Sequence, residues 1–326
     1  MLSRVADSIY WMSRYIERAE NVARVVEVNL QLMLDLPVPS TGEQWDALVT
    51  TTGDHGKFSE RFGTATPANV IQFLAFDGEN PNSILSCLRA ARESARMIRE
   101  VITADMWEQL NTFYLLVQDA ALEGRAFSSP HDFFSQVRRA SHLFVGATDA
   151  TMSHGEAWRF CRLGRKLERA DKTTRILDVK YFLLLPTVAD VGTPIDDIQW
   201  TAVLRSASAL QMYRKRHGRV SPERIVDFLL LDREFPRAVH YCLIVVDDSL
   251  HAISGTPSGT FCNRAEQCVG QLRSELAFTD VAGIIAGGLH GFLDRLQLRL
   301  NAVGEAIHES FFAPPALDHM TPVVGQ

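Results

Sequence analysis

Apolar residues recur at intervals of three and four along most of this 326-residue chain, which is the spacing of one buried face of an α-helix. The first such stripe runs from Ile9 to Met33 and ends before Pro37 and Pro39, which cannot continue a helix. No segment alternates polar and apolar residues over the length of a strand. The pattern therefore predicts an all-α fold.

Prolines and small polar residues mark where later helices begin. Pro67, Pro81, Pro222 and Pro236 suit a first helical turn, where the missing N–H is not needed, and Asn80 is a candidate N-cap. We predict further helices at approximately 43–52, 67–76, 80–102, 103–123, 130–151, 198–217, 222–231, 260–276 and 280–311.

The chain also contains an internal repeat. Ser13–Glu20 aligns with Gly164–Asp171 at an offset of 151 residues, and both segments contain the pattern Arg-x-x-Glu-Arg-Ala. Beyond the next loop the offset becomes 155, and the identities then include Gln44-Trp45 with Gln199-Trp200. We therefore predict that an ancestral helical unit was duplicated. The expected product is one globule of two tandem, pseudo-twofold-related helical-bundle repeats, residues 1–151 and 152–313, with a disordered tail at 314–326.

Composition narrows the class of protein without changing the predicted fold. Hydrophobic residues make up 46% and charged residues 22%, which is ordinary for a globular protein. The net charge of −6 argues against non-specific binding to nucleic acid, and a helix C-terminus explains the short basic run at 214–219. Since no stretch of about 18 apolar residues exists, we predict no membrane span.

The cysteines and the N-terminal segment indicate a compartment. The five cysteines form no CxxC pair and no metal-binding spacing, which is typical of a reducing environment. Charged residues near the N-terminus interrupt any signal-peptide core. We therefore predict a cytoplasmic protein, whose oligomeric state the sequence does not fix.

The repeated Arg-Glu-Arg pattern places its charged residues on one helical face. The two stripes contain Arg14, Glu17, Arg18 and Asn21, and Arg165, Glu168, Arg169 and Lys172. Repeats that meet about a pseudo-twofold axis form reciprocal contacts, so we predict ion pairs between the two repeats. The predicted partners are Glu17 with Arg169 or Arg165, and Glu168 with Arg18 or Arg14.

A second interpretation of these stripes is a ligand site. Guanidinium groups would hold a carboxylate or phosphate, and a glutamate would position an amine. We favour the structural network, because repeated ion pairs often only organise a fold. Beside the stripes, the i,i+4 pairs Glu20–Arg24 and Asp171–Arg175 are predicted to be surface pairs that contribute little stability.

Other kinds of site have less support in the sequence. Helix N-termini at Asn80, Ser83 and Arg237 could bind an anion through free N–H groups, although we favour ordinary capping. A di-metal bundle needs Glu-x-x-His in both halves. Glu305–His308 fits this pattern and Asp248–His251 nearly fits it, but the first repeat has no matching half-site, so we predict no metal. The chain also shows no nucleophile motif and no phosphate-binding glycine loop.

Several segments of the chain match the pattern of one known family. They are Met1–Arg4, Tyr10-Trp11, Arg14–Asn21, Asn80-Pro81, Ala91–Glu93, Arg96, Met106-Trp107 and Trp158–Ala170. Together they resemble the Alpha-E family, a bacterial helical domain named for its Glu-Arg motif, and the resemblance covers essentially the whole chain. The second repeat has Phe235-Pro236 where the resemblance leads us to expect Asn-Pro.

The resemblance implies a functional context. Alpha-E proteins are associated with, and sometimes fused to, circularly permuted ATP-grasp proteins, often beside transglutaminase-like proteins. This suggests an accessory protein that acts with an ATP-grasp-type ligase in amide or peptide bond formation. ATP and Mg²⁺ would then belong to the ligase, since this chain has no nucleotide motif. Two alternatives stay open: a stand-alone aminoacyl- or peptidyl-transferase that uses the motif carboxylates, and a metal-binding helical bundle.

Overall fold

The computed structural model describes residues 1–35, 41–182 and 193–313. Every regular element within these ranges is a helix, so the predicted all-α fold class is confirmed. The predicted tail at 314–326 and the prolines Pro37 and Pro39 lie outside the described residues.

The first half of the chain begins with a long helix and continues with shorter ones. Its elements are α1 (Ser3–Asp35), α2 (Thr41–Thr52), α3 (His55–Phe62), α4 (Pro67–Ile71) with a π-helical turn (Gln72–Phe76), α5 (Ile84–Met97), α6 (Ala104–Glu123), α7 (Arg125–Ser128) and α8 (Pro130–Thr151).

The second half follows a similar order. Its elements are α9 (Glu156–Phe182), α10 (Pro194–Ser206), α11 (Leu210–His217), α12 (Pro222–Leu230), α13 (Val239–Ser254), α14 (Arg264–Ala277), α15 (Val281–Ala286) and α16 (Leu289–Ile307) with a closing π-helical turn (His308–Phe312).

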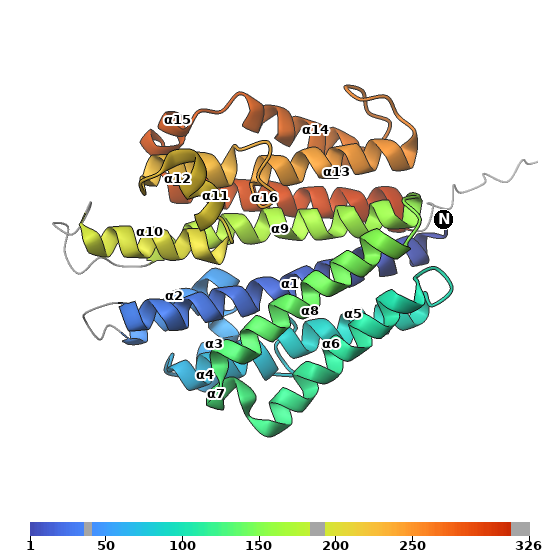
Figure 1. Ribbon diagram of the computed structural model, residues 1–326. Helices are drawn as coiled ribbons and strands as arrows, with labels where there is room; N and C mark the ends of the chain where they lie inside the picture. Colours follow the sequence, from blue (N-terminus) through green and yellow to red (C-terminus); the bar gives the residue numbers. More distant parts are fainter. Residues whose placement is uncertain (36–40, 183–192, 314–326) are drawn as a thin grey trace, which may run out of the picture.

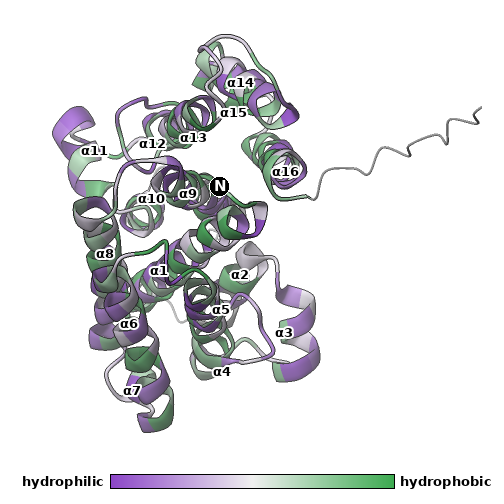
Figure 2. Ribbon diagram, turned by 90° about the vertical axis from the view of Figure 1, so that its right-hand side faces the viewer, coloured by the Kyte–Doolittle hydropathy of each residue, from purple (hydrophilic) through white to green (hydrophobic). Residues whose placement is uncertain are grey.

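The two long motif-bearing helices, α1 and α9, lie side by side at the centre of the molecule (Figure 1). Helices α5 and α8 pack on α1, and α13 and α16 pack on α9. Figure 2 shows hydrophilic residues concentrated on outward faces, for example of α3 and α11. Buried apolar side chains from both halves form one continuous core, which the stripe of α1 enters through Ile9, Met12 and Ile16.

A glycine permits the close contact between the two central helices. At Gly164 of α9, an added Cβ would lie 2.4 Å from the backbone oxygen of Tyr10 in α1. At the equivalent position in α1, 151 residues earlier, the buried Ser13 side chain is hydrogen-bonded to the Cys161 thiol. Tyr10 and Cys161 are themselves 151 residues apart, so the two contacts are reciprocal.

Several local contacts recur at the predicted offset of 155 residues. They are the ion pairs Arg61–Asp77 and Arg216–Asp232, the positive-φ glycines Gly63 (φ 67°) and Gly218 (φ 72°), and thiol contacts of 3.6 Å from Cys87 to the Pro81 oxygen and from Cys242 to the Pro236 oxygen. A duplication predicts recurrences of this kind, and the duplication itself stays a prediction.

Two predicted helix starts are wrong. Helix α5 is capped by Ser83, whose hydroxyl accepts from the Ser86 N–H at 3.1 Å, and Asn80 lies before the helix. The buried Asn80 side chain instead donates to the Phe73 oxygen at 3.1 Å and accepts from the Asn82 N–H at 2.9 Å. Pro236 likewise precedes its helix, which begins at Val239.

Several predicted helices also end or break at positions that differ from the prediction. The helix predicted at 198–217 is two helices, since Ser208 between them has φ 51°. The helix predicted at 280–311 breaks before α16, where Gly288 has φ 89°. The helix predicted to reach residue 102 ends at Met97, the one predicted from 260 begins at Arg264, and α3 was not predicted at all.

Candidate functional site

The two charged stripes face each other across the contact between α1 and α9, which we call the seam. On one side of the seam, the Glu168 carboxylate accepts from Arg14 Nε at 2.8 Å and from Arg18 Nε at 2.7 Å. Lys172 Nζ lies 3.5 Å from the same carboxylate. The predicted pairing of Glu168 with Arg18 or Arg14 is therefore confirmed, and both arginines contribute.

The other side of the seam is built around Glu17. Its carboxylate accepts from Arg169 Nε and Nη2, both at 2.7 Å, so the predicted pairing with Arg169 is confirmed. Arg237 Nη1 lies 3.3 Å from the same group, and the Asn21 amide donates to it at 3.1 Å. Arg165 makes no hydrogen bond or ion pair with any described residue, unlike its counterpart Arg14.

Burial and ion pairing act against each other on the two motif glutamates. Burial alone raises the pKa of a carboxyl group, but Arg169 and Arg237 outweigh it and hold the pKa of Glu17 far below its usual range. Arg18, Lys172 and Arg14 have the same effect on Glu168. Both carboxylates therefore stay ionised at neutral pH.

The i,i+4 pairs beside the stripes are not surface pairs, which corrects the prediction. Glu20 and Arg24 are 1% and 2% exposed, because α8 and the segment before α13 cover them. Both Glu20 oxygens accept from Arg237 Nη2 at 3.0 Å, and Arg24 contacts Glu20 and Ser208. The Asp171 side chain, the partner of Arg175, is likewise only 10% exposed.

A cleft of about 550 Å³ opens beside Glu17, between α1, α8, α9 and the segment before α13. We call it the Glu17 cleft. Its polar lining consists of Glu17, Glu20, Ser141, His142, Asp149, Arg165, Arg169, Ser208 and Arg237. The sequence alone could predict that Arg165, Arg169 and Glu17 lie together. It could not predict that α8 and Arg237 also line the cleft.

Three arginines line this cleft and Arg24 contacts Glu20 beside it, so guanidinium groups are crowded here. Burial, together with Arg237 and Arg138, lowers the pKa of Arg24 to about 8. Burial and Arg169 lower the pKa of Arg237 to about 10, and the same two causes lower the pKa of Arg165. These shifts arise because the guanidinium groups are buried and lie close to one another, and an arrangement of this kind is suited to an anionic ligand.

The three residues predicted to bind an anion at helix N-termini divide into two groups. Asn80 and Ser83 are fully buried, and Ser83 both caps α5 and donates to the Asp77 oxygen at 2.7 Å. These contacts favour the capping interpretation for Ser83, whereas the Asn80 side chain bonds to the backbone of Phe73 and Asn82. Arg237 acts through its side chain, which belongs to the Glu17 cleft, and not through a helix terminus.

Lys166 and His142 are two cleft neighbours that the sequence reasoning missed. Burial and the nearby Arg169 lower the pKa of Lys166 to about 7, and its Nζ donates to the Pro236 oxygen at 3.3 Å. His142 lies 3.7 Å from Glu20, and burial with Arg24 lowers its pKa. No periodicity in the sequence brings α8 or Pro236 to the motif, so only the fold reveals them.

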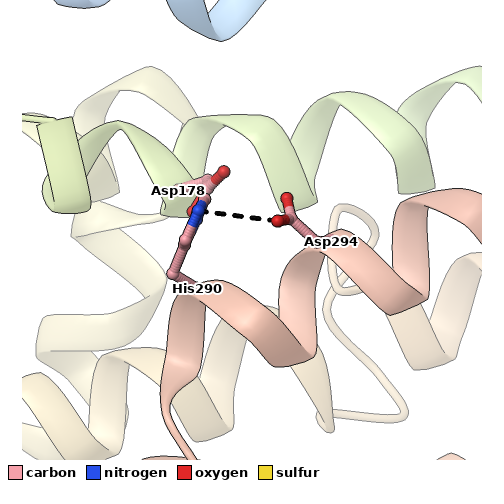
Figure 3. A group of neighbouring side chains, drawn as sticks. All are labelled: Asp178, His290 and Asp294. Atoms are coloured by element: carbon pink, nitrogen blue, oxygen red, sulfur yellow. Dashed lines mark hydrogen bonds and ion pairs between the residues drawn. The ribbon is translucent and has the colours of Figure 1, made fainter.

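Within the described ranges, one group of three neighbouring side chains consists of residue types that can bind a metal ion. These are Asp178, His290 and Asp294, whose possible ligand atoms lie within 4.8 Å of one another (Figure 3). His290 Nδ1 lies 2.8 Å from Asp178, while its Nε2 lies 3.5 Å from Asp294. The two ring nitrogens thus face different carboxylates, which suits a protonated imidazole linking α9 to α16. This group contains none of the residues from the Glu-x-x-His patterns weighed in the sequence. Of those residues, His251 pairs with Asp247 at 3.5 Å.

The His290 bridge predicts a pH dependence of stability. The hydrogen bond to Asp178 raises the pKa of His290 above 6.5 in the folded state, so the folded protein binds this proton more tightly than the unfolded chain does. The stabilisation is complete below the unfolded pKa and is lost as the pH rises through the folded value. In urea unfolding, stability should fall as the pH rises above about 6.5, and we expect His290→Gln to make this fall smaller. Equal losses in both proteins would contradict the bridge.

No helix in the described part of the chain combines the length and the apolar character that a membrane crossing requires.

Comparison with known proteins identifies relatives along the whole motif-bearing region. The family Alpha-E, described as a predicted alpha-helical domain with a conserved ER motif, matches residues 1–312. Uncharacterized proteins of Mycobacterium bovis and of two Mycobacterium tuberculosis strains are 23% identical over 321 residues. That match covers 92% of this chain but only 35% of each relative, so the chain spans about a third of their length. No solved structure matches the chain significantly. With its two Glu-Arg helices forming the central seam, the chain belongs to the Alpha-E family.

Proposed function

We propose that this protein is a helical accessory partner of an ATP-grasp-type ligase in amide or peptide bond formation, and that it binds an anionic group of the ligase's substrate. One observation carries the proposal. The motif glutamates are buried in ion pairs, whereas Arg165 of the same motif faces an open cleft and has no partner among the described residues. This arrangement is suited to binding and not to proton transfer.

The alternative of a stand-alone transferase requires a carboxylate that can exchange protons near neutral pH. Glu17 and Glu168 do not meet this requirement, because their arginine partners hold both pKa values far below the usual range. A mechanism with either group as general base would first have to break its ion pairs. We therefore prefer a role in which the ligase supplies the chemistry.

The lengths of the mycobacterial relatives also support a role beside an enzyme. The matched region fills 35% of each of those proteins, so about two thirds of their length is available for other functions, including catalysis. In such a protein, the region that matches this chain would bind the substrate and another region would catalyse its reaction.

A reconstitution experiment tests the proposed function. The protein is co-purified with an ATP-grasp ligase of the same organism, and amide product is measured by mass spectrometry with Mg²⁺ and ATP. We expect a stable complex and at least roughly tenfold more product per unit time than with the ligase alone, because bound substrate is positioned for reaction. An unrelated helical protein of similar size serves as control. Absence of both the complex and the stimulation would sink the proposal, and ATP-independent product without the ligase would favour the transferase.

A further inference from the structure

Arg165 and its counterpart Arg14 differ in the partners of their guanidinium groups. Arg14 donates to Glu168 at 2.8 Å and to the Tyr10 hydroxyl at 2.9 Å, and its guanidinium lies 4.8 Å from the centre of the Trp11 ring. At the positions equivalent to Tyr10 and Trp11, the second repeat has Cys161 and Arg162. Neither offers the hydroxyl or the aromatic ring that holds Arg14, so Arg165 lacks these partners.

A second difference between the two repeats adds a positive charge beside Glu17. Position 82 carries an asparagine, which accepts from Arg18 and donates to Asp54 at 3.1 Å. The equivalent residue, 155 positions later, is Arg237, and it occupies the Glu17 and Glu20 carboxylates. Arg169 also binds Glu17, and Arg165 makes no hydrogen bond to either of these two carboxylates in the described part of the chain.

The charges buried around the Glu17 cleft therefore do not balance. Four guanidinium groups, those of Arg24, Arg165, Arg169 and Arg237, face the two carboxylates of Glu17 and Glu20. Arg24 Nε is buried without a hydrogen-bond partner in the described part of the chain. Asp149 lines the cleft only at its rim, with a side chain that is 62% exposed. Buried cationic groups without matching anions are costly unless a ligand supplies the anion.

The cleft does not end at Arg165. A second hollow of about 670 Å³ lies between α6 and α8, and both hollows are lined by His142 and Gly146 of α8. Because they share these two residues, the hollows adjoin each other at α8, and we call the two together the groove. Such a groove fits an extended chain with its anionic group at Arg165 better than it fits a small ion alone.

We propose that this groove binds a peptide through a carboxylate that Arg165 holds, with the rest of the peptide passing over Gly146. The carboxylate is the C-terminal group or an acidic side chain. The inference rests on the proposed function in that the bound peptide would be the substrate of the ligase. It assigns to Arg165 the binding role and leaves to Arg14, Arg18 and Arg169 the structural one.

The test is a calorimetric titration of the purified full chain with four probes. They are a blocked triglycine with a free C-terminal carboxylate, a blocked Gly-Gly-Glu with an amidated C-terminus, a triglycine blocked at both ends, and inorganic phosphate. We expect one or both carboxylate peptides to bind, and the fully blocked peptide not to bind. The first two probes distinguish a terminal from a side-chain carboxylate. Phosphate binding as tight as that of the peptides would overturn the proposal, as would the absence of binding by both carboxylate peptides.

Variants separate binding from folding. Arg165→Gln is expected to weaken peptide binding at least about tenfold without lowering the melting temperature, because it breaks no ion pair with a described residue and relieves repulsion from Arg169. Gly146→Leu is expected to block the groove and still fold, since a Cβ at Gly146 meets no atom within 4 Å. Arg162→Gln, on the same helix but outside the cleft, is the matched control and should bind normally.

The outcomes of this test are distinct from those of the reconstitution. Unchanged peptide affinity in Arg165→Gln would overturn the assignment of the groove even if the ligase complex forms. If the ligase complex and the stimulation of product formation are both absent but peptide binding is intact, the proposed function is overturned and the assignment of the binding site is not.

Discussion

Replacing Glu168 with glutamine is expected to lower the free energy of unfolding by about 3–5 kcal/mol, because the change strands two buried arginines. Arg14 and Arg18 lose the charge that balances theirs, and the Glu168 side chain is 0% exposed, so water cannot take its place. Urea unfolding at neutral pH, followed by circular dichroism, measures the loss. The matched control is Glu309→Gln, whose ion pair with Arg264 is exposed on both sides and is worth less than about 1 kcal/mol.

Acid titration adds an independent check on the same residue. The folded-state pKa of Glu168 lies well below its ordinary value of 4.5, so the stabilisation is present above that value and is lost as the pH falls below it. The variant lacks this titrating group. The difference in stability between wild type and Glu168→Gln should therefore shrink below about pH 4.5. A difference that stays constant down to about pH 3 would show that the ion pairs do not stabilise the fold.

The second large effect is expected at Gly164, where α1 and α9 are in closest contact. In Gly164→Ala the new Cβ would lie 2.4 Å from the Tyr10 backbone oxygen and 3.1 Å from its ring, so the helices must move apart. We expect a loss of about 3 kcal/mol, at the upper end of ordinary overpacking, because the obstacle is backbone and cannot rotate away. Thermal unfolding monitored by circular dichroism measures it.

A second glycine supplies the matched control for this substitution. Gly270 lies inside α14, and a Cβ there meets no atom within 4 Å. Gly270→Ala should therefore stabilise the protein by roughly 0.5–1 kcal/mol, the usual gain from alanine in a helix. If both variants shift the melting temperature in the same direction, the contact between α1 and α9 is not as close as described.

The reciprocal ion pairs of the seam could be predicted because the sequence repeats the whole motif. Two copies of one amphipathic helix bury similar faces, so the charged stripe of one copy faces that of the other. The prediction paired Glu17 with Arg169 or Arg165, and Glu168 with Arg18 or Arg14. The structure pairs Glu17 with Arg169, and Glu168 with both Arg18 and Arg14. The roles of these residues in binding stay a prediction.

The Glu17 cleft could not be predicted in the same way. Its remaining walls come from α8 and from the segment before α13, and Arg237 lies 220 positions from Glu17 along the chain. Helical periodicity describes one helix at a time and does not report which distant segment covers it. For the same reason Glu20 and Arg24 looked like exposed residues, although other segments bury them.

The wrong prediction of a helix start at Asn80 is explained by a turn that forms just before α5. Asn80 and Pro81 favour the first turn of a helix, but the buried Asn80 side chain folds back onto the Phe73 oxygen and the Asn82 N–H. This turn competes with the helix for the same backbone groups. A short-range pattern cannot decide between the two outcomes when tertiary contacts favour one of them.

The packing of α1 against α9 of the second half has a consequence for synthesis on the ribosome. This helix is synthesised before α9 and the segment before α13, so Glu17 can pair with Arg169 and Arg237 only after those later residues have been made. The Tyr10 ring, moreover, packs 5.3 Å from that of Phe312, close to the last described residue. The nascent chain therefore carries an incompletely covered amphipathic helix throughout elongation, a surface that chaperones recognise and that favours aggregation if translation stops early.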